Sequence, residues 1–141
     1  MSAWGVGPFE NDDALDFLGE VEESARAGQL DSVSRPLQQL AFSAGYLEAP
    51  LISEGIAAAA LLGAALRPSE AADEPSAPDW VGGLAAGDVP NELVEVARRA
   101  LRRALHPDNN ELHDLWSESD GLADWQSAVR RVLCWLGDRD D

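Results

Sequence analysis

One uncharged, alanine-rich segment constrains the fold of this chain more than any other feature. Residues 55–66 contain only glycine, isoleucine, alanine and leucine. A helix that spans a membrane needs about 20 consecutive apolar residues, so this segment is too short to cross a bilayer. We therefore expect a buried helix, because its small alanine side chains let neighbouring helices pack closely against it.

The composition predicts one globular domain that covers residues 1–141. The chain has 141 residues, of which 45% are hydrophobic, and this fraction is too high for a disordered protein despite a net charge of −16. A chain of this length buries roughly two-thirds of its unfolded surface around a single core. Two independent domains would not fit comfortably into it.

The cysteine content indicates a cellular compartment, and the net charge argues against some classes of binding partner. The single cysteine, Cys134, has no partner for an internal disulfide, and the N-terminus lacks the pattern of a secretory signal. We expect a cytoplasmic protein. The excess of 26 acidic over 10 basic residues repels phosphates and anionic lipids, which argues against nucleic acid and membrane partners.

Apolar residues recur at helical spacing along most of the chain, which predicts an all-α fold of about six helices. No segment shows the alternation typical of a strand. The expected helices run from Asn11-Asp12-Asp13 to near Gly28, from about Ser34 to near Gly45, from Ser53 to about Leu66, from Asn91 to Pro107, from Asp108 through Trp116, and from Asp120 to Gly137.

Three of these helix starts depend on particular residues. Pro36 is expected in the first turn of its helix, where the missing N–H costs nothing. Residues 48–50 are expected to interrupt the helical structure, and Ser53 is then expected to cap the next helix. Asp108 and Glu111 have the spacing of a capping box.

Residues 67–90 predict a long acidic loop that is rich in proline and glycine. Connections of this length are unusual inside a compact domain, so the loop is expected either to be mobile or to be held against the domain by an anchoring residue. Trp80 beside Val81 is the expected anchor.

The opening of the chain, Trp4-Gly5-Val6-Gly7-Pro8-Phe9-Glu10-Asn11-Asp12-Asp13-Ala14, carries a resemblance to a known family. It resembles the Trp-Gly-x-Gly-x-Phe-x-Asn-Asp signature of a bacterial family known as domain of unknown function 4259. Residues 46–50 and 110–116 resemble later blocks of that family. Where the family's pattern has Asn-Ser-Glu-Leu, this chain has Asn109-Asn110-Glu111-Leu112, which should preserve helix capping. The resemblance implies no established activity.

The signature has a structural reading and a functional one. Gly5 and Gly7 allow a positive φ or a close backbone approach, so that Trp4 and Phe9 turn back onto the domain. Asn11 or Asp12 then starts the first helix. A structural role, in which the N-terminal segment is held against the domain, accounts for every residue of the signature. The alternative is a ligand pocket with Trp4 as its floor.

Asp12, Asp16, Glu20 and Glu23 form an acidic stripe, because their spacing places them along one line of the first helix. Solvent and counter-ions are the simplest complement to this charge. The alternatives are a basic partner protein, a metal ion, and an internal seam with the four arginines between 98 and 103. No compact loop that would gather metal-binding oxygens is visible, so no metal site is predicted.

No catalytic constellation is predicted from this sequence. His106, His113 and Cys134 lie in separate segments without a catalytic context, and the Gly-x-Gly motif lacks the strand of a dinucleotide site. We therefore expect no catalytic residue and no cofactor.

The favoured functional hypothesis is a non-enzymatic protein that binds a basic macromolecule through the acidic stripe. A concrete form is an immunity-like or antitoxin-like inhibitor of a basic toxin, because acidic inhibitors gain speed from electrostatic steering. The alternative is a small-ligand or metal-binding protein, or an enzyme. Its pocket would gather Asn11, Asp12 and Asp16 with Glu111 or Glu118 beside Trp4.

The oligomeric state is left open between a monomer and a homodimer. Trp135 lies on the flank of the apolar face of the last helix. It is expected either to be covered by the loop at 67–90 or to form a dimer interface.

Overall fold

The computed structural model describes residues 5–24, 28–71, 74, 87 and 89–137, and it confirms the all-α fold. One parallel β-bridge joins two described residues, Leu47 and Asn110. The helices are α1 (Asp12–Glu23), α2 (Gln29–Phe42), α3 (Ala49–Leu66), α4 (Pro68–Ala71), α5 (Asn91–Leu105), α6 (Glu111–Ser117) and α7 (Leu122–Trp135).

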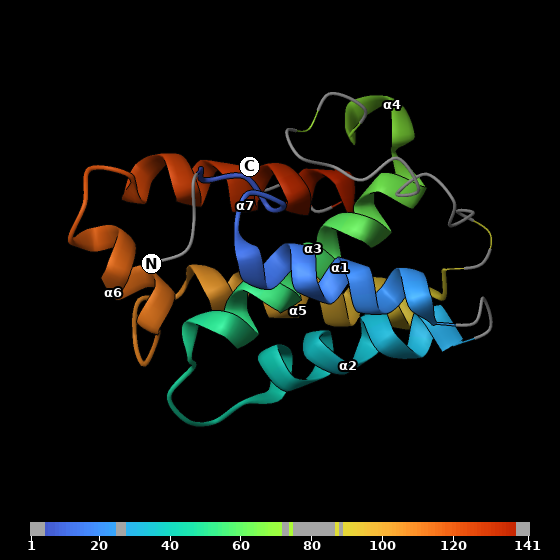
Figure 1. The fold of residues 1–141 in the computed structure, drawn as a ribbon, viewed down its shortest axis with the longest axis horizontal. Helices are drawn as coiled ribbons and strands as arrows, with labels where there is room; N and C mark the ends of the chain where they lie inside the picture. The colour runs from blue at the N-terminus through green and yellow to red at the C-terminus, as the bar shows by residue number, and fades with distance from the viewer. Residues whose placement is uncertain (1–4, 25–27, 72–73, 75–86, 88, 138–141) are drawn as a thin grey trace.

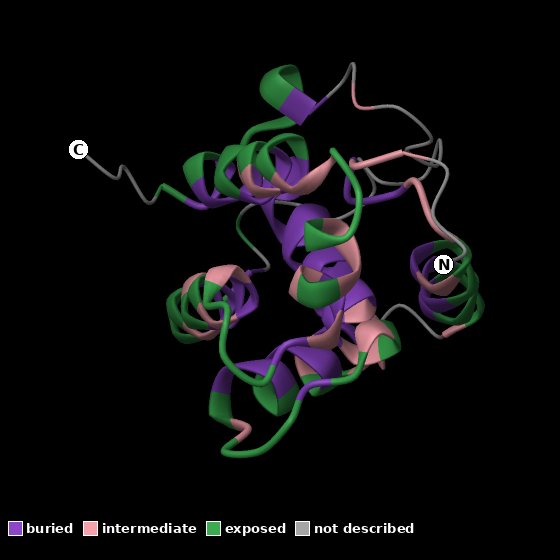
Figure 2. Cartoon of the chain, turned by 90° about the vertical axis from the view of Figure 1, so that its left-hand side faces the viewer, coloured by how far each residue is buried: buried purple, intermediate pink, exposed green. Residues whose placement is uncertain are grey.

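The alanine-rich segment forms α3, which is the central helix of the fold (Figures 1 and 2). It packs against α1, α2, α5 and α7, and its residues 55–65 are all buried. By length and composition alone α3 could span a membrane, but 72% of it is buried inside the protein. Its alanines let the four neighbours approach closely, as we expected from the sequence.

Two arginines of α5 tie neighbouring helices to it. Arg98 donates hydrogen bonds to the carbonyl oxygen of Leu136 at 2.6 and 3.0 Å, at the end of α7. Arg99 donates to the carbonyl oxygen of Ala41 at 3.1 Å, at the end of α2. Helix C-termini carry partial negative charge, so each guanidinium stabilises the helix end that it contacts.

The structure corrects the predicted starts of α2 and α3. α2 begins at Gln29, so Pro36 lies inside the helix and the backbone loses one hydrogen bond there. Val33 and Leu37 on the same face are both completely buried, and this burial offsets part of the loss. α3 begins at Ala49 with Pro50 in its first turn, which is the position we had expected for Pro36.

Other helix ends also differ from the prediction. α1 ends at Glu23, several residues before Gly28, and the N–H of Ser24 bonds the carbonyl of Val21. Pro90, and not Asn91, occupies the cap position of α5. The spacing of apolar residues locates a helix but not its first and last residues, which depend on the backbone conformation at single positions.

Asn110 caps α6 in place of the predicted Asp108. Its Oδ1 accepts a hydrogen bond from the N–H of His113 at 2.8 Å, while its Nδ2 donates to the carbonyls of Ala104 at 2.7 Å and His106 at 3.0 Å. The side chain is completely buried. A single amide thus starts α6 and also satisfies two carbonyl groups at the end of α5.

Trp135 is part of the core, which corrects the expectation that it lines an interface; most of the loop expected to cover it lies outside the described residues. Its side chain is 3% exposed and packs against Gly63 of α3. A Cβ atom at Gly63 would lie only 2.8 Å from the Cβ of Trp135. The missing side chain of Gly63 therefore makes the space for this tryptophan. Gly137 follows α7 with a φ of 85°, as expected for a C-terminal cap.

The segment predicted as a loop begins with the short helix α4. Glu74 then forms an ion pair with Arg131 of α7, with 2.7 Å between the charged atoms. Trp80 and Val81 lie outside the described residues, so their predicted role as an anchor stays a prediction.

Candidate functional site

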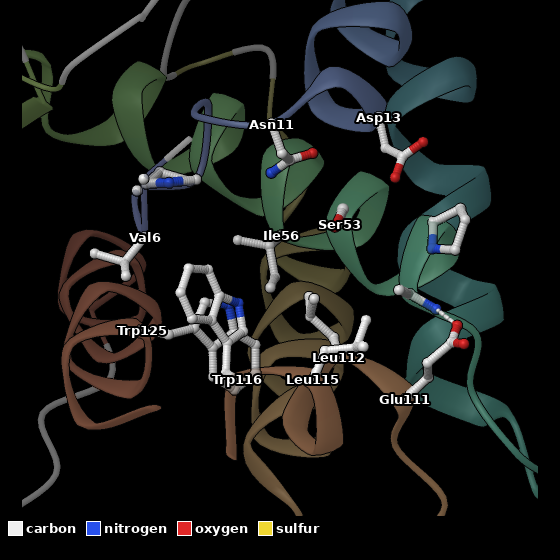
Figure 3. Close-up of a pocket in the computed structure, with 15 residues that line it drawn as sticks. Val6, Asn11, Asp13, Ser53, Ile56, Glu111, Leu112, Leu115, Trp116 and Trp125 are labelled. Carbon is white, nitrogen blue, oxygen red and sulfur yellow. Dashed lines mark hydrogen bonds between the residues drawn. The ribbon is translucent and has the colours of Figure 1, made fainter. Parts of the chain in front are cut away.

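A pocket of about 240 Å³ lies where the N-terminal segment meets the starts of α3, α6 and α7 (Figure 3). Residues far apart in the sequence form it together. They are Gly5, Val6, Gly7, Pro8, Asn11, Asp13, Ala49, Pro50, Ser53, Ile56, Glu111, Leu112, Leu115, Trp116 and Trp125.

The N-terminal wall of the pocket is a turn that folds around the carboxylate of Glu10. This carboxylate accepts a hydrogen bond from the N–H of Gly7 at 3.1 Å. A Cβ atom would lie 2.3 Å from it at Gly5 and 2.6 Å from it at Gly7. Neither glycine has a positive φ, so close approach is the reason for glycine at both positions. Phe9 follows and is 1% exposed.

The starts of α3 and α6 are joined directly and form the side of the pocket that carries Glu111. The N–H of Leu47 bonds the carbonyl of Asn109 at 2.8 Å, and the N–H of Glu111 bonds the carbonyl of Leu47 at 3.0 Å. The Oε1 of Glu111 accepts a hydrogen bond from the N–H of Ala49 at 2.7 Å. One oxygen of this carboxylate therefore caps α3, while the residue lines the pocket.

Asn11, Asp13 and Ser53 supply further polar groups. Asn11 caps α1 by accepting a hydrogen bond from the N–H of Ala14 at 2.7 Å, and Figure 3 shows its amide nitrogen turned away from α1. The side chain of Ser53 is 5% exposed, and none of the described residues forms a hydrogen bond with its hydroxyl group. Likewise, no described residue forms an ion pair or hydrogen bond with the carboxylate of Asp13.

Two tryptophans form the opposite side of the pocket. Trp125 is 4% exposed and Trp116 is half-buried, and Figure 3 shows both indole rings across the pocket from Asp13 and Glu111. The ring of Trp116 lies on the backbone of Gly121, where a Cβ atom would be 2.6 Å from ring carbons. The pocket thus has an aromatic side and a carboxylate side.

The electrostatic character of the pocket is negative. The lining residues include the two acids Asp13 and Glu111 and no basic side chain. Glu54 lies one position after Ser53, and its pKa is raised above the ordinary value of 4.5, chiefly because burial disfavours its charge. Arg35 opposes this rise, whereas the negative charges of Glu20 and Asp13 add to it.

The structure brings together only some of the residues expected in a pocket. Asn11 and Glu111 line it, whereas Asp12 and Asp16 are exposed on α1 outside it, and Glu118 is exposed beyond α6. Trp4, expected as the floor, lies outside the described residues.

Sequence reasoning missed Asp13, Ser53, Trp116 and Trp125 as pocket residues. Ser53 was expected to cap a helix, and neither tryptophan was assigned to a site. The one sequence signal for Ser53 is its position directly after two apolar residues, Leu51 and Ile52, close to the apolar segment at 55–66.

The acidic stripe of α1 stands apart from the pocket. All four of its residues, Asp12, Asp16, Glu20 and Glu23, are exposed. The predicted seam with the α5 arginines is not formed by Arg98, Arg99 or Arg103, which bond the carbonyls of Leu136, Ala41 and Asn109. α3 lies between α1 and α5 (Figures 1 and 2).

The two histidines and the cysteine that were weighed for catalysis, His106, His113 and Cys134, do not line the pocket. Cys134 is exposed on α7, and the Nδ1 of His106 accepts a hydrogen bond from the N–H of Asp108 at 3.2 Å. Over the described ranges, no three His, Cys, Asp or Glu side chains gather as a metal site.

Comparison with known proteins identifies a family. No curated protein and no solved structure matches this chain. One family model matches residues 2–128, a span that includes every residue lining the pocket. The protein therefore belongs to the family described as a domain of unknown function (DUF4259).

Proposed function

We propose that this protein binds a small organic ligand in the pocket between its N-terminal segment and helices α3, α6 and α7. The observation that carries this function is Ser53, a 5% exposed residue that lines the pocket and whose hydroxyl has no hydrogen bond with any described residue. The volume of about 240 Å³ is below the roughly 300–1,000 Å³ typical of sites for drug-sized molecules, which favours a small ligand.

A purely structural role does not explain this arrangement. The hydroxyl of Ser53 faces the pocket and bonds no described residue, whereas an alanine would suit a helix already rich in alanine equally well. A ligand in the pocket could hydrogen-bond this hydroxyl without displacing a protein contact. The carboxylate of Asp13 on one side and the exposed part of Trp116 on the other offer such a ligand further contacts.

The lining residues support binding better than catalysis. They include no histidine, cysteine or lysine, and so lack the residue types that most often serve as a nucleophile or as the base that activates a serine. The proposed role is reversible ligand binding.

A fragment screen by NMR tests this proposal, with the indole N–H signals of Trp116 and Trp125 as reporters. Fragments of all charge types are added at concentrations up to about 1 mM, a range suited to weak ligands. Binding that shifts these two signals supports the pocket. Ser53→Ala should weaken fragment binding, because it removes a hydroxyl that bonds no described residue, and should change the free energy of unfolding by less than about 1 kcal/mol.

The matched control is Ser127→Ala, which removes an exposed hydroxyl from α7. It should leave fragment binding unchanged. A screen in which no fragment shifts the two indole signals would refute the proposed function.

The acidic stripe of α1 supports a second candidate, the binding of a basic protein partner. Its four carboxylates are exposed together, and Arg98, Arg99 and Arg103 form their hydrogen bonds elsewhere. A surface of this kind accelerates encounter with a positively charged protein. The immunity-like or antitoxin-like role, in a cytoplasmic protein, is one form of this candidate.

A variant that replaces Asp12, Asp16, Glu20 and Glu23 with their amides tests the second candidate. A basic partner should bind the unmodified protein in a salt-dependent way and should lose affinity for the variant. The control carries the same number of amide substitutions at exposed acids outside α1, namely Glu70, Asp108, Glu118 and Asp120. If both variants lose affinity for the partner equally, the stripe is not a specific binding surface.

A further inference from the structure

We infer that the ligand of this pocket is an organic cation, with an ammonium group held at Asp13 and an apolar body against Trp116 and Trp125. This inference rests on the proposed function and adds the chemical class of the ligand.

The charges around the pocket favour a cation. Asp13 and Glu111 line it and no lining residue is basic, in a chain whose net charge is −16. Because the Oε1 of Glu111 already bonds the N–H of Ala49, Asp13 has the freer carboxylate of the two. A buried anion would be repelled by both groups, whereas a cation would be attracted by both.

The helix starts at the pocket are mostly occupied. Four helices, α1, α3, α6 and α7, begin there, and N-terminal amides commonly bind anions. A side-chain oxygen already occupies one amide at the starts of α1, α3 and α6, whereas α7 has no side-chain cap. Asn11 bonds the N–H of Ala14, Glu111 that of Ala49, and Asn110 that of His113. These amides are therefore not free to bind a phosphate or carboxylate.

The polar groups also match the hydrogen-bonding needs of an ammonium group. A primary ammonium donates three hydrogen bonds and accepts none. The carboxylate of Asp13 and the hydroxyl of Ser53 both accept hydrogen bonds, and neither has a partner among the described residues. The second oxygen of Glu111 is a further acceptor on the same side of the pocket (Figure 3).

The aromatic side determines the other end of the ligand. Trp116 and Trp125, with Val6, Ile56 and Leu115, provide apolar contact across the pocket from the acids. An aryl or alkyl group would pack there, and aromatic faces also attract cations. A short amine with an apolar body therefore satisfies both sides at once.

The experiment compares probes that share one shape and differ in charge. 2-Phenylethylammonium, 2-phenylethanol and 3-phenylpropionate are titrated into the full-length protein, and the indole signals of Trp116 and Trp125 are followed by NMR. We expect the ammonium to bind at least about tenfold more tightly than the alcohol, as is typical of a hydrogen-bonded charge. The carboxylate should bind most weakly.

Asp13→Asn and Asp12→Asn form a matched pair of variants. Both remove one charge from the first turn of α1, but only Asp13 lines the pocket. Asp13→Asn should weaken binding of the ammonium by about tenfold and leave binding of the alcohol unchanged, whereas Asp12→Asn should change neither. Urea denaturation of each variant shows that both remain folded.

The outcomes separate the two proposals. If the alcohol or the carboxylate binds as tightly as the ammonium, or if both variants weaken the ammonium equally, the cation inference is wrong while ligand binding stands. If no probe shifts either indole signal and the broader fragment screen also fails, the proposed function itself is refuted.

Discussion

The carboxylate of Glu111 accepts a hydrogen bond at 2.7 Å from the backbone N–H of Ala49, 62 residues earlier in the chain. This bond joins the first turns of α6 and α3, which both line the pocket. It gives Glu111 a structural role at α3 in addition to its place in the candidate site.

Replacing Glu111 should therefore destabilise the fold before any ligand is considered. Glu111→Ala should lower the free energy of unfolding by about 1–2 kcal/mol, because the N–H of Ala49 loses its cap. Glu111→Gln should cost less than half of this, since its amide oxygen still accepts the bond. Urea denaturation measures both, and Asp114→Ala, at an exposed position of the same helix, should stay within about 0.5 kcal/mol of the unmodified protein.

Substitution of Asn110 should lower the stability of the fold more than substitution of most other polar residues. Asn110→Ala removes the cap of α6 and leaves two carbonyls without their donor, so it should cost about 2–4 kcal/mol. Asn110→Ser keeps a capping oxygen and loses only the donors, so it should cost about half as much. Thermal unfolding distinguishes these cases, and equal losses for the two variants would contradict this division of roles.

Gly5 and Glu10 should be energetically coupled. A Cβ atom at Gly5 would displace the Glu10 carboxylate, so Gly5→Ala and Glu10→Ala should each remove the hydrogen bond to the N–H of Gly7, at a cost of about 1 kcal/mol. The double variant should then cost little more than either single one. A double-mutant cycle by urea denaturation measures this coupling, and additive costs would show that the two residues act independently.

Gly63→Ala and Gly19→Ala should have opposite effects on stability. The Cβ at Gly63 would meet the Cβ of Trp135, which is fixed to its own backbone, so overpacking should cost about 1–3 kcal/mol. Gly19 lies inside α1 with no atom within 4 Å of the added Cβ, so helix propensity should raise stability by about 1 kcal/mol. Differential scanning calorimetry compares the two variants, and destabilisation by Gly19→Ala would count against the geometry of α1.

Glu54 should make the fold less stable as the pH rises. Burial raises its pKa in the folded state above 4.5, so the folded protein binds the proton more tightly than the unfolded chain does. Its contribution to stability is therefore fully present below pH 4.5 and is lost as the pH rises through the folded pKa. Glu54→Gln should melt at a higher temperature than the unmodified protein at pH 7 and at nearly the same temperature at pH 4.

The control for Glu54 is Glu118→Gln, which removes one exposed charge. It separates the effect of burial from the general benefit of lowering the net charge. If both variants change the melting temperature equally at pH 7, burial of Glu54 is not the cause.

The sequence predicted those features that depend on local pattern. The apolar segment at 55–66 indicated a buried central helix, because a run without charge is stable only out of water. The spacing of apolar residues indicated the other long helices and the all-α class. The position of Gly137 after a helical pattern indicated a C-terminal cap, since glycine adopts a positive φ without strain.

Tertiary structure decided what local pattern leaves open. Pro36 and Pro50 are both compatible with a first turn or a break, and only in the folded structure does Pro36 lie inside a helix, where Val33 before it is buried in the core. Trp135 became a core residue because Gly63, far away in sequence, leaves room for it.

The pocket is the clearest case of a feature that the chain acquires only by folding. Asp13, Ser53 and Trp125 belong to three different helices, and nothing in their local sequence relates them. The bridge between Leu47 and Asn110, a contact between distant segments, joins the starts of two helices that line the pocket, α3 and α6. Sequence by itself determined which segments are helical, because helices form through local hydrogen bonds; only packing of those helices determined which side chains share a cavity.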